Sequence, residues 1–215
     1  MQSDLLKDIV YNRIKDKIIS GYFPLGSKLS EARLTEELNC NKAPIRAALN
    51  MLNTEGLVQV KPKSGTYVFN VTNEELNDLL YFRCSIETEA LILAYRKNKH
   101  SLIQKLSLIY DLMDNTIKEN NVSSYLDLDN KFHDTLIEAT SNRYFSESFR
   151  LISSKMATIK NKLGSNPEHM KRSHRQHLNI IQGLIEDNLE QSSVIELKEH
   201  ILPEHGAYWS KQNIS

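Results

Sequence analysis

The sequence predicts a mainly α-helical chain with one short β-hairpin near its N-terminus, and three observations support this prediction. Only seven glycines and five prolines occur among its 215 residues. Apolar residues recur at helical spacing along most of the chain, and throughout the part from residue 71 onward. The segments 57–60 and 66–69 instead alternate and are rich in β-branched residues, as strands are.

The composition is that of an ordinary soluble globular protein, with 40% hydrophobic and 25% charged residues. No apolar run approaches the ~20 residues that a membrane span needs, and the N-terminal stretch lacks the apolar segment of a signal peptide. Cys40 and Cys84 lie far apart, which favours a reducing compartment without a disulfide framework. We therefore expect a cytoplasmic protein with no membrane partner.

The first 70 residues contain the elements of a winged helix-turn-helix in the right order. They are a helix at 4–19, a short helix at 33–38, a polar turn at 39–41, a second helix at 43–55, and strands at 57–60 and 66–69. Ser30 is a candidate N-cap for the short helix, and Gly56 ends the second one. Two short helices joined by a three-residue turn form a helix-turn-helix, and the hairpin forms its wing. We therefore predict a winged helix-turn-helix domain over residues 1–70.

The helix at 43–55 presents an apolar stripe and a separate polar stripe. Ile45 and Leu49 belong to the apolar stripe, whereas Lys42 and Arg46 lie one turn apart on the polar one. A recognition helix requires this division, because one face holds the fold and the other carries donors for base edges and phosphates. For the helix alone, a merely solvated face stays open as the alternative. The preceding turn and the following basic hairpin favour nucleic acid.

Charge and position identify further candidates for contacts with nucleic acid. Residues 1–70 include ten basic and seven acidic residues, a net charge of +3, and the remainder has a net charge of −3. Asn41 lies at the start of the helix, where backbone N–H groups favour a phosphate. Gly65 allows the wing to approach a groove closely. The predicted DNA-binding residues are Arg33, Asn41, Lys42, Ala43, Arg46, Lys63 and Gly65.

Residues 71–215 are predicted to form a second domain, an all-α helical bundle. The expected helices span 72–97, 101–120, 123–139, 142–163, 168–187 and 190–202, with Asn- and Gly-containing joints between them. Thr72 and Glu75 have the spacing of a capping box at the start of the first of these helices.

Ionisable side chains lie on faces of these helices that should be buried. Asp129 and His133 are four residues apart on one apolar stripe, and His177 and His200 lie on inward stripes of two later helices. A buried carboxylate requires a partner, and imidazole together with carboxylate suits Zn²⁺, Ni²⁺, Mn²⁺ or Fe²⁺. Bundle cores commonly hold such sites. Each histidine alone is more often a satisfied core residue, and spacing alone does not exclude His174 as a ligand.

The N-terminal part of the chain resembles the winged helix-turn-helix of the GntR-family bacterial transcription regulators. The matching motifs are Gly21, Gly26, Leu29-Ser30-Glu31, Pro44-Ile45-Arg46, Glu55-Gly56-Leu57 and Gly65-Thr66. The resemblance implies a homodimer on a palindromic operator, with Arg46 and Lys42 reading bases. The family usually has Ser/Thr-Arg before the Pro, where this chain has Asn41-Lys42. The operator sequence therefore does not follow from the resemblance.

Residues 72–202 resemble the FCD ligand-binding domain of the FadR subgroup of this family. The matching residues are Arg83, Glu87, Asp129, Phe132, His133, Asn142, His177, Ile180, Asp187 and His200. The metal ligands that the resemblance implies are Asp129, His133, His177 and His200. It also implies a small carboxylate effector at the open positions of the metal and at Arg83, with Asn142 as a second effector-binding residue. Gln176 stands where the family usually has a Glu beside His177.

Together these features predict a ligand-responsive transcription regulator, a repressor and not an enzyme, whose DNA binding is controlled by a small organic acid at a metal site. A metal-dependent enzyme is the alternative from another class, because three histidines and an aspartate around a metal can activate water. That alternative leaves the helix-turn-helix unexplained, and the sequence offers no separate general base. A second alternative is that residues 71–215 form a metal-free dimerisation domain.

Overall fold

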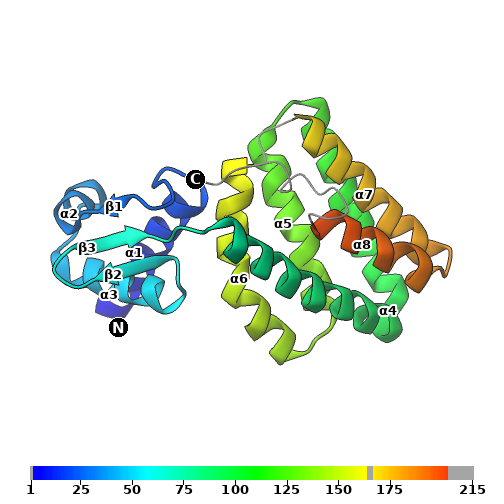
Figure 1. The fold of residues 1–215 in the computed structure, drawn as a ribbon, viewed down its shortest axis with the longest axis horizontal. Helices are drawn as coiled ribbons and strands as arrows, with labels where there is room; N and C mark the ends of the chain where they lie inside the picture. The colour runs from blue at the N-terminus through cyan, green and yellow to red at the C-terminus, as the bar shows by residue number, and fades with distance from the viewer. Residues whose placement is uncertain (1, 164–166, 203–215) are drawn as a thin grey trace. The chain divides into compact units, whose positions relative to one another are not determined.

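The computed structural model describes residues 2–163 and 167–202 (Figure 1). Its contacts divide the chain into two compact units. The first comprises Met1–Val71 together with Ser154–Ile159, and the second comprises Thr72–Ser153 and Lys160–Ser215. A small N-terminal sheet with its helices is followed by a helical bundle, so the predicted fold class is confirmed. Among the described helices, none combines the length and the apolar character that crossing a membrane requires.

The first unit has the predicted helices and strands, with bounds shifted by one or two residues. They are α1 (Gln2–Ile19), β1 (Lys28–Leu29), α2 (Glu31–Leu38), α3 (Lys42–Thr54), β2 (Val58–Lys61) and β3 (Gly65–Val68). The strands form an antiparallel sheet in the order β1-β3-β2. Strand β1 was not predicted, because two residues are too few to show an alternating pattern.

The core of this unit forms where α1 packs against α3. Ile14 and Ile18 of α1 and Ile45 and Leu52 of α3 are fully buried. The apolar stripe predicted for α3 is therefore confirmed, and burying it leaves the opposite stripe exposed to solvent.

Two local features define the ends of α2 and the turn that leads to α3. The Ser30 hydroxyl accepts a hydrogen bond from the backbone N–H of Arg33, which confirms Ser30 as the N-cap of α2. Asn39 ends α2 in the left-handed conformation, with φ of 48°. Asparagine tolerates this conformation better than most residues, so the chain turns sharply before α3 begins.

The second unit is a helical bundle (Figure 1). Its helices are α4 (Asn73–Lys118), α5 (Val122–Ala139), α6 (Arg143–Leu163), α7 (Pro167–Ile185), the π-helical turn η1 (Leu189–Ser193) and α8 (Val194–Ile201). The Ser154–Ile159 part of α6 is assigned to the first unit. Helix α4 packs against α5, α7 and α8. These packed helices carry the polar residues that the sequence places on buried faces.

Helix α4 contains both of the first two helices that the sequence predicts for this unit. The capping box at its start is confirmed: the N–H of Glu75 lies 3.1 Å from Thr72 Oγ1, and the N–H of Thr72 lies 2.8 Å from Glu75 Oε2. Asn98 interrupts the helix with φ of −161° and ψ of 79°. Its Oδ1 atom accepts a hydrogen bond from the N–H of Ser101 and so caps the second segment.

The segment after α7 differs from the prediction, because residues 189–193 form a π-helical turn before α8 begins. This turn packs closely on α7 at Gly183. A Cβ atom at Gly183 would lie 2.6 Å from Ser192 Oγ. Ser193 is buried and its hydroxyl donates a hydrogen bond to the carbonyl of Ile180 at 2.8 Å. The close approach thus depends on the missing side chain of glycine.

Candidate metal centre and nucleic-acid interface

The polar stripe of α3 lies exposed at the start of the helix. Asn41, Lys42 and Ala43 form its exposed first turn, and Asn41 makes no side-chain capping hydrogen bond there. Arg46 follows one turn later, with 65% of its side chain exposed and its Nε atom 2.9 Å from Glu31 Oε2. An exposed ion pair of this kind contributes little to stability. The guanidinium is thus held at the surface, where a stronger anion can compete for it.

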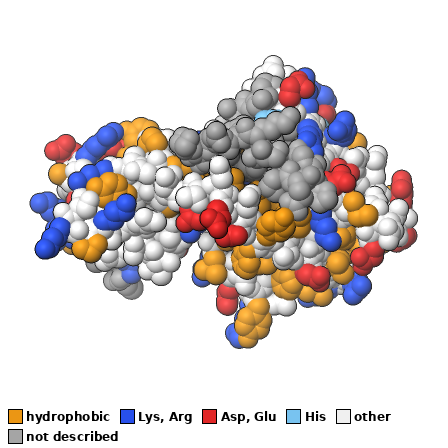
Figure 2. Space-filling model, viewed as in Figure 1, with side chains coloured by type: hydrophobic (Ala, Val, Ile, Leu, Met, Phe, Trp, Pro, Cys, Tyr) orange, Lys and Arg blue, Asp and Glu red, His pale blue; other side chains and the backbone are white. Residues whose placement is uncertain are grey.

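The wing also presents basic groups to solvent. Lys63, between β2 and β3, has a left-handed φ of 60°, and Gly65 follows with φ of 122°. The Nζ atoms of Lys28 and Lys61 lie 5.8 and 5.0 Å from the ring centroid of Tyr67. Figure 2 shows Lys and Arg side chains gathered at the end of this unit where Figure 1 places α2 and the β2–β3 loop. Arg33 on α2 is 67% exposed and pairs with Glu37.

In the second unit, the four predicted metal ligands come together. One ligand atom from each of Asp129, His133, His177 and His200 lies within 4.8 Å of the other three. The two residues of α5 and His177 of α7 are buried, and His200 of α8 is 9% exposed. Residues that are far apart in the sequence thus form one compact donor set of three imidazoles and a carboxylate.

The hydrogen bonds of two Nδ1 atoms determine which ring nitrogens point into the donor set with a free lone pair. Nδ1 of His133 lies 2.6 Å from the Glu87 carboxylate, and Nδ1 of His200 lies 3.3 Å from Gln176 Oε1. Both partners accept hydrogen bonds, so each Nδ1 carries the proton. The two Nε2 atoms then face each other with lone pairs, 3.1 Å apart. A cation between them removes this repulsion, and the residues present therefore fit a metal ion.

Burial also favours the neutral form of all three histidines, which is the form that metal ligation requires. Burial lowers the pKa of His133, lowers that of His200 well below its usual range, and lowers that of His177 to about 3. Neither ring nitrogen of His177 has a hydrogen-bond partner among the described residues. Buried polar atoms without hydrogen-bond partners are rare in folded proteins, and His177 Nε2 lies 3.6 Å from Asp129 Oδ1, so His177 also fits a metal ion.

Arg83 and Glu87 form a buried ion pair beside the cluster. Arg83 Nε lies 2.5 Å from Glu87 Oε1, and both side chains are almost fully buried. Burial opposes the charge of Glu87, but the Arg83 guanidinium and the hydrogen bonds from Arg83 and His133 lower its pKa to about 2. Glu87 therefore stays ionised and joins Arg83 to a predicted metal ligand. The sequence pattern had marked the two residues without assigning Glu87 this role.

Lys160 of α6 is the residue of this cluster that the sequence reasoning missed. Its ammonium contacts Asp129 Oδ2, and it also lies 3.1 Å from Asn130 Oδ1. The other oxygen of Asp129 accepts a hydrogen bond from Ser173 at 3.2 Å. The signal was available, because Lys160 follows the buried Met156 by four residues on the same helix face. A cation on an apolar stripe requires a buried partner, just as the carboxylate of Asp129 does.

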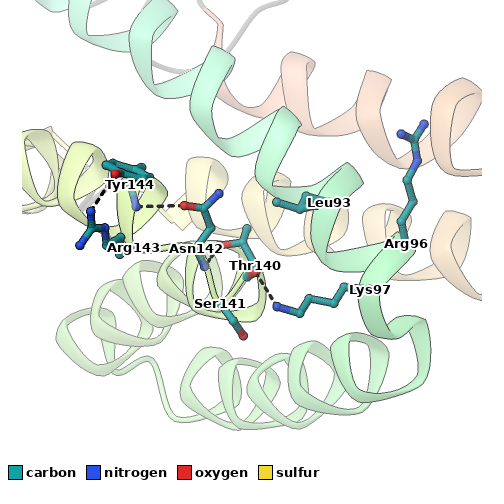
Figure 3. Close-up of a pocket in the computed structure, with 8 residues that line it drawn as sticks. All are labelled: Leu93, Arg96, Lys97, Thr140, Ser141, Asn142, Arg143 and Tyr144. Atoms are coloured by element: carbon teal, nitrogen blue, oxygen red, sulfur yellow. Dashed lines mark hydrogen bonds between the residues drawn. The ribbon is translucent and has the colours of Figure 1, made fainter.

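The structure does not bring Asn142 to the cluster. Asn142 precedes α6, where its Oδ1 atom accepts a hydrogen bond from the N–H of Tyr144 at 3.0 Å (Figure 3). It lines a surface pocket of about 590 Å³ with Leu93, Arg96, Lys97, Thr140, Ser141, Arg143 and Tyr144. None of these residues belongs to the cluster. The geometry gives Asn142 a capping role, and its role toward an effector stays a prediction.

His174, which spacing alone did not exclude as a ligand, also lies apart from the donor set. Its ring stacks on that of Tyr110 with centroids 4.2 Å apart, and its Nε2 atom lies 3.5 Å from Asp114 Oδ1. Gln176 contacts His200 rather than its neighbour His177. Gln176, which differs from the usual Glu of the family, therefore orients the ring of His200 and not that of His177.

Comparison with protein families agrees with both units. The family described as "Bacterial regulatory proteins, gntR family" matches residues 6–68, and the FCD domain matches residues 78–201. The chain is 29% identical over 131 residues to the gluconate operon transcriptional repressor of Bacillus licheniformis, covering 61% of this chain and 54% of that protein. It thus spans about half the length of that relative.

A second relative and two solved structures cover more of the chain. The Nta operon transcriptional regulator of Aminobacter aminovorans is 26% identical over 185 residues, which are 85% of each chain. A putative transcriptional regulator GntR from Rhodococcus sp. RHA1 superposes with a TM-score of 0.83 at 18% identity, covering 96% of this chain and 99% of that one. E. coli McbR/YncC superposes with a TM-score of 0.81 at 19% identity, with 96% and 98% covered. At these identities the two structures establish the fold alone.

Proposed function

This chain belongs to the gntR family of bacterial regulatory proteins and has an FCD domain, and we propose that it is a cytoplasmic DNA-binding transcription repressor. Its operator binding is controlled by a small carboxylate at a metal site in the FCD domain. The family and the named relatives are transcription regulators, not enzymes. The metalloenzyme alternative therefore has no support beyond the chemistry of the donor set.

Helix α3 enters the major groove in this proposal, as recognition helices of this motif do. Arg46 suits a bidentate contact with guanine O6 and N7, and Lys42 suits a base or a phosphate. Asn41 and Ala43 bring the backbone of the first turn close to a phosphate. Lys63 and Gly65 place the wing against the backbone or the minor groove, and Arg33 contacts a phosphate. Two copies of the chain, as a homodimer, read the two halves of a palindromic operator.

Asp129, His133, His177 and His200 hold a divalent cation, of which Zn²⁺, Ni²⁺, Mn²⁺ and Fe²⁺ suit this donor set. The lone pairs of His133 and His200 that face each other 3.1 Å apart are the single observation that carries this proposal. When bound, the metal supplies Lewis acidity at open coordination positions, where a carboxylate oxygen coordinates. Arg83, held by Glu87 beside the cluster, provides the positive charge that orients the effector.

Effector binding then shifts the equilibrium between conformations of the dimer that bind DNA well and poorly. Thermodynamic linkage requires that operator DNA change effector affinity by the same factor as effector changes DNA affinity. A carboxylate that controls DNA binding must therefore bind with different affinity when operator DNA is present. A carboxylate that binds without any effect on DNA binding shows no such difference.

The test starts with selection of binding sequences from random double-stranded DNA by full-length protein without a histidine tag. We expect a palindromic sequence to be enriched. Fluorescence anisotropy on that DNA then measures the dissociation constant with metal and a panel of small mono- and dicarboxylates. At least one acid should change it by roughly 5- to 150-fold. No enriched sequence would contradict the DNA-binding role, whereas enrichment without any acid effect would contradict only the control mechanism.

A further inference from the structure

Lys160 is a buried cation in direct contact with a predicted metal ligand. Its side chain is 4% exposed, and its ammonium pairs with Asp129, which is 5% exposed. Burial disfavours the charge and lowers the pKa of Lys160, although the Asp129 carboxylate opposes this effect. The same contact holds the pKa of Asp129 well below its usual range against the cost of burial. Each charge is therefore tolerated in the interior because the other is present.

This contact places a positive charge beside the donor set. Lys160 contacts Oδ2 of Asp129, whereas the other oxygen of the same carboxylate, Oδ1, lies 3.6 Å from His177 Nε2. A divalent cation at Asp129 would place a second positive group beside the ammonium in a medium of low dielectric constant. Metal binding on its own is consequently opposed by Lys160.

The net charge of the groups around the cluster indicates which kind of ligand would offset the repulsion between Lys160 and the metal. Asp129, Glu87 and the half-buried Asp134 are acidic, and Arg83 and Lys160 are basic, while the histidines are neutral. With all five charged the set has a net charge of −1, and a divalent cation changes it to +1. If Asp134 is protonated, the same cation changes the net charge from 0 to +2. In both cases the excess is positive, and one carboxylate group reduces it.

We propose that Lys160 is a residue of the effector site that makes metal binding and carboxylate binding cooperative. Without a carboxylate, the positive charge of its ammonium beside Asp129 weakens metal binding. With a carboxylate present, the ammonium pairs with the incoming anion, which offsets its repulsion of the metal. This inference rests on the proposed metal site and adds to it a residue that strengthens the coupling beyond what coordination of the carboxylate to the metal and its contact with Arg83 supply.

The test uses full-length, chelator-treated protein and isothermal titration calorimetry with ZnCl₂, in the absence and presence of sodium succinate. Lys160→Gln removes the charge but keeps an N–H donor for Asp129. Lys162→Gln, an exposed position two residues further along α6, is the matched control. In wild type and control, we expect succinate to strengthen zinc binding by roughly fivefold or more. In Lys160→Gln, zinc alone should bind roughly tenfold more tightly than to wild type. Succinate should strengthen zinc binding less than in wild type, because only its contacts with the metal and Arg83 remain.

The possible outcomes separate the two proposals. If zinc binds to wild type and to Lys160→Gln with equal affinity and equal response to succinate, the role of Lys160 is wrong and the metal site stands. If folded wild type binds no zinc, the metal site and the coupling both fail. Should circular dichroism show that Lys160→Gln does not fold, Lys160→Met replaces it, with the same expected affinities. If both variants are unfolded, the rise in melting temperature of wild type on adding zinc with and without succinate decides whether the two ligands are coupled.

Discussion

The Glu87 carboxylate of α4 holds Nδ1 of His133 on α5 at 2.6 Å and so directs Nε2 of that histidine into the cluster. Because such outer partners fix the tautomer and the ring orientation of a ligand, their loss commonly lowers metal affinity 10- to 100-fold. We expect a loss of about this size for Glu87→Gln, measured by zinc titration of chelator-treated protein. Glu89→Gln, an exposed position on the same helix, is the control and should bind zinc as wild type does.

Glu87→Gln should also destabilise the second unit, since it leaves the buried Arg83 without its countercharge. Breaking a buried ion pair costs about 3–5 kcal/mol. Zinc affinity is therefore measured on samples whose folded fraction has been checked by circular dichroism. Unchanged affinity in folded Glu87→Gln would show that His133 does not depend on this partner.

Substitution of Arg46 tests the recognition face of α3. Arg46→Ala should lose about 1–3 kcal/mol of binding free energy on the selected operator and relax its specificity, because a bidentate base contact is lost. Arg96→Ala is a matched control, since Arg96 is 70% exposed and lies 3.9 Å from Glu190, much as Arg46 pairs with Glu31. Anisotropy on operator and random DNA measures both variants. Equal losses on the two DNAs would mean that Arg46 contacts phosphate and not a base.

Metal content distinguishes the proposed site from a metal-free dimerisation domain. Protein purified without a histidine tag should contain about one divalent metal ion per chain, and its removal by a chelator should lower the melting temperature. Returning metal at 100 times its dissociation constant should restore about 2.7 kcal/mol of stability. Elemental analysis and thermal unfolding measure these effects. A content below ~0.2 per chain, unchanged after incubation with each candidate metal, would favour the metal-free alternative.

Gly183→Ala tests the packing of η1 on α7. Alanine favours a helix over glycine by up to about 1 kcal/mol, but its methyl group would lie 2.6 Å from Ser192 Oγ and also meet Ser193. Overpacking of this kind costs about 1–3 kcal/mol, so we expect a net loss of stability in urea unfolding. A gain would show that the serines move aside without cost.

The fold was largely predictable because helical periodicity and turn residues are local signals. Ser30, Thr72 and Asn39 act where the sequence places caps and turns. Strand β1 and the π-helical turn were not predictable in the same way. Strand β1 exists only because β3 pairs with it, and the turn at 189–193 has the composition of an ordinary helix.

The candidate site was predictable where one helix supplies two ligands or a polar residue interrupts an apolar stripe. Asp129 and His133 satisfied both conditions. The partners of these residues depend on which helices pack together, and nothing in the local pattern pairs Lys160 with Asp129 or Glu87 with His133. Asn142 shows another dependence on packing, because its side chain caps α6 away from the cluster, and its effector role stays a prediction.

Lys63 has a conformation that glycine or asparagine adopts at lower cost. A non-glycine side chain in the left-handed region is strained by roughly 1 kcal/mol or more. Lys63→Gly relieves this strain and should unfold at a higher temperature than wild type. The same variant should bind operator DNA less well, because it loses the positive charge of Lys63. If Lys63 contacts DNA as proposed, stability and DNA affinity oppose each other at the wing tip, and a variant stabilised there for crystallisation would lose part of its DNA binding.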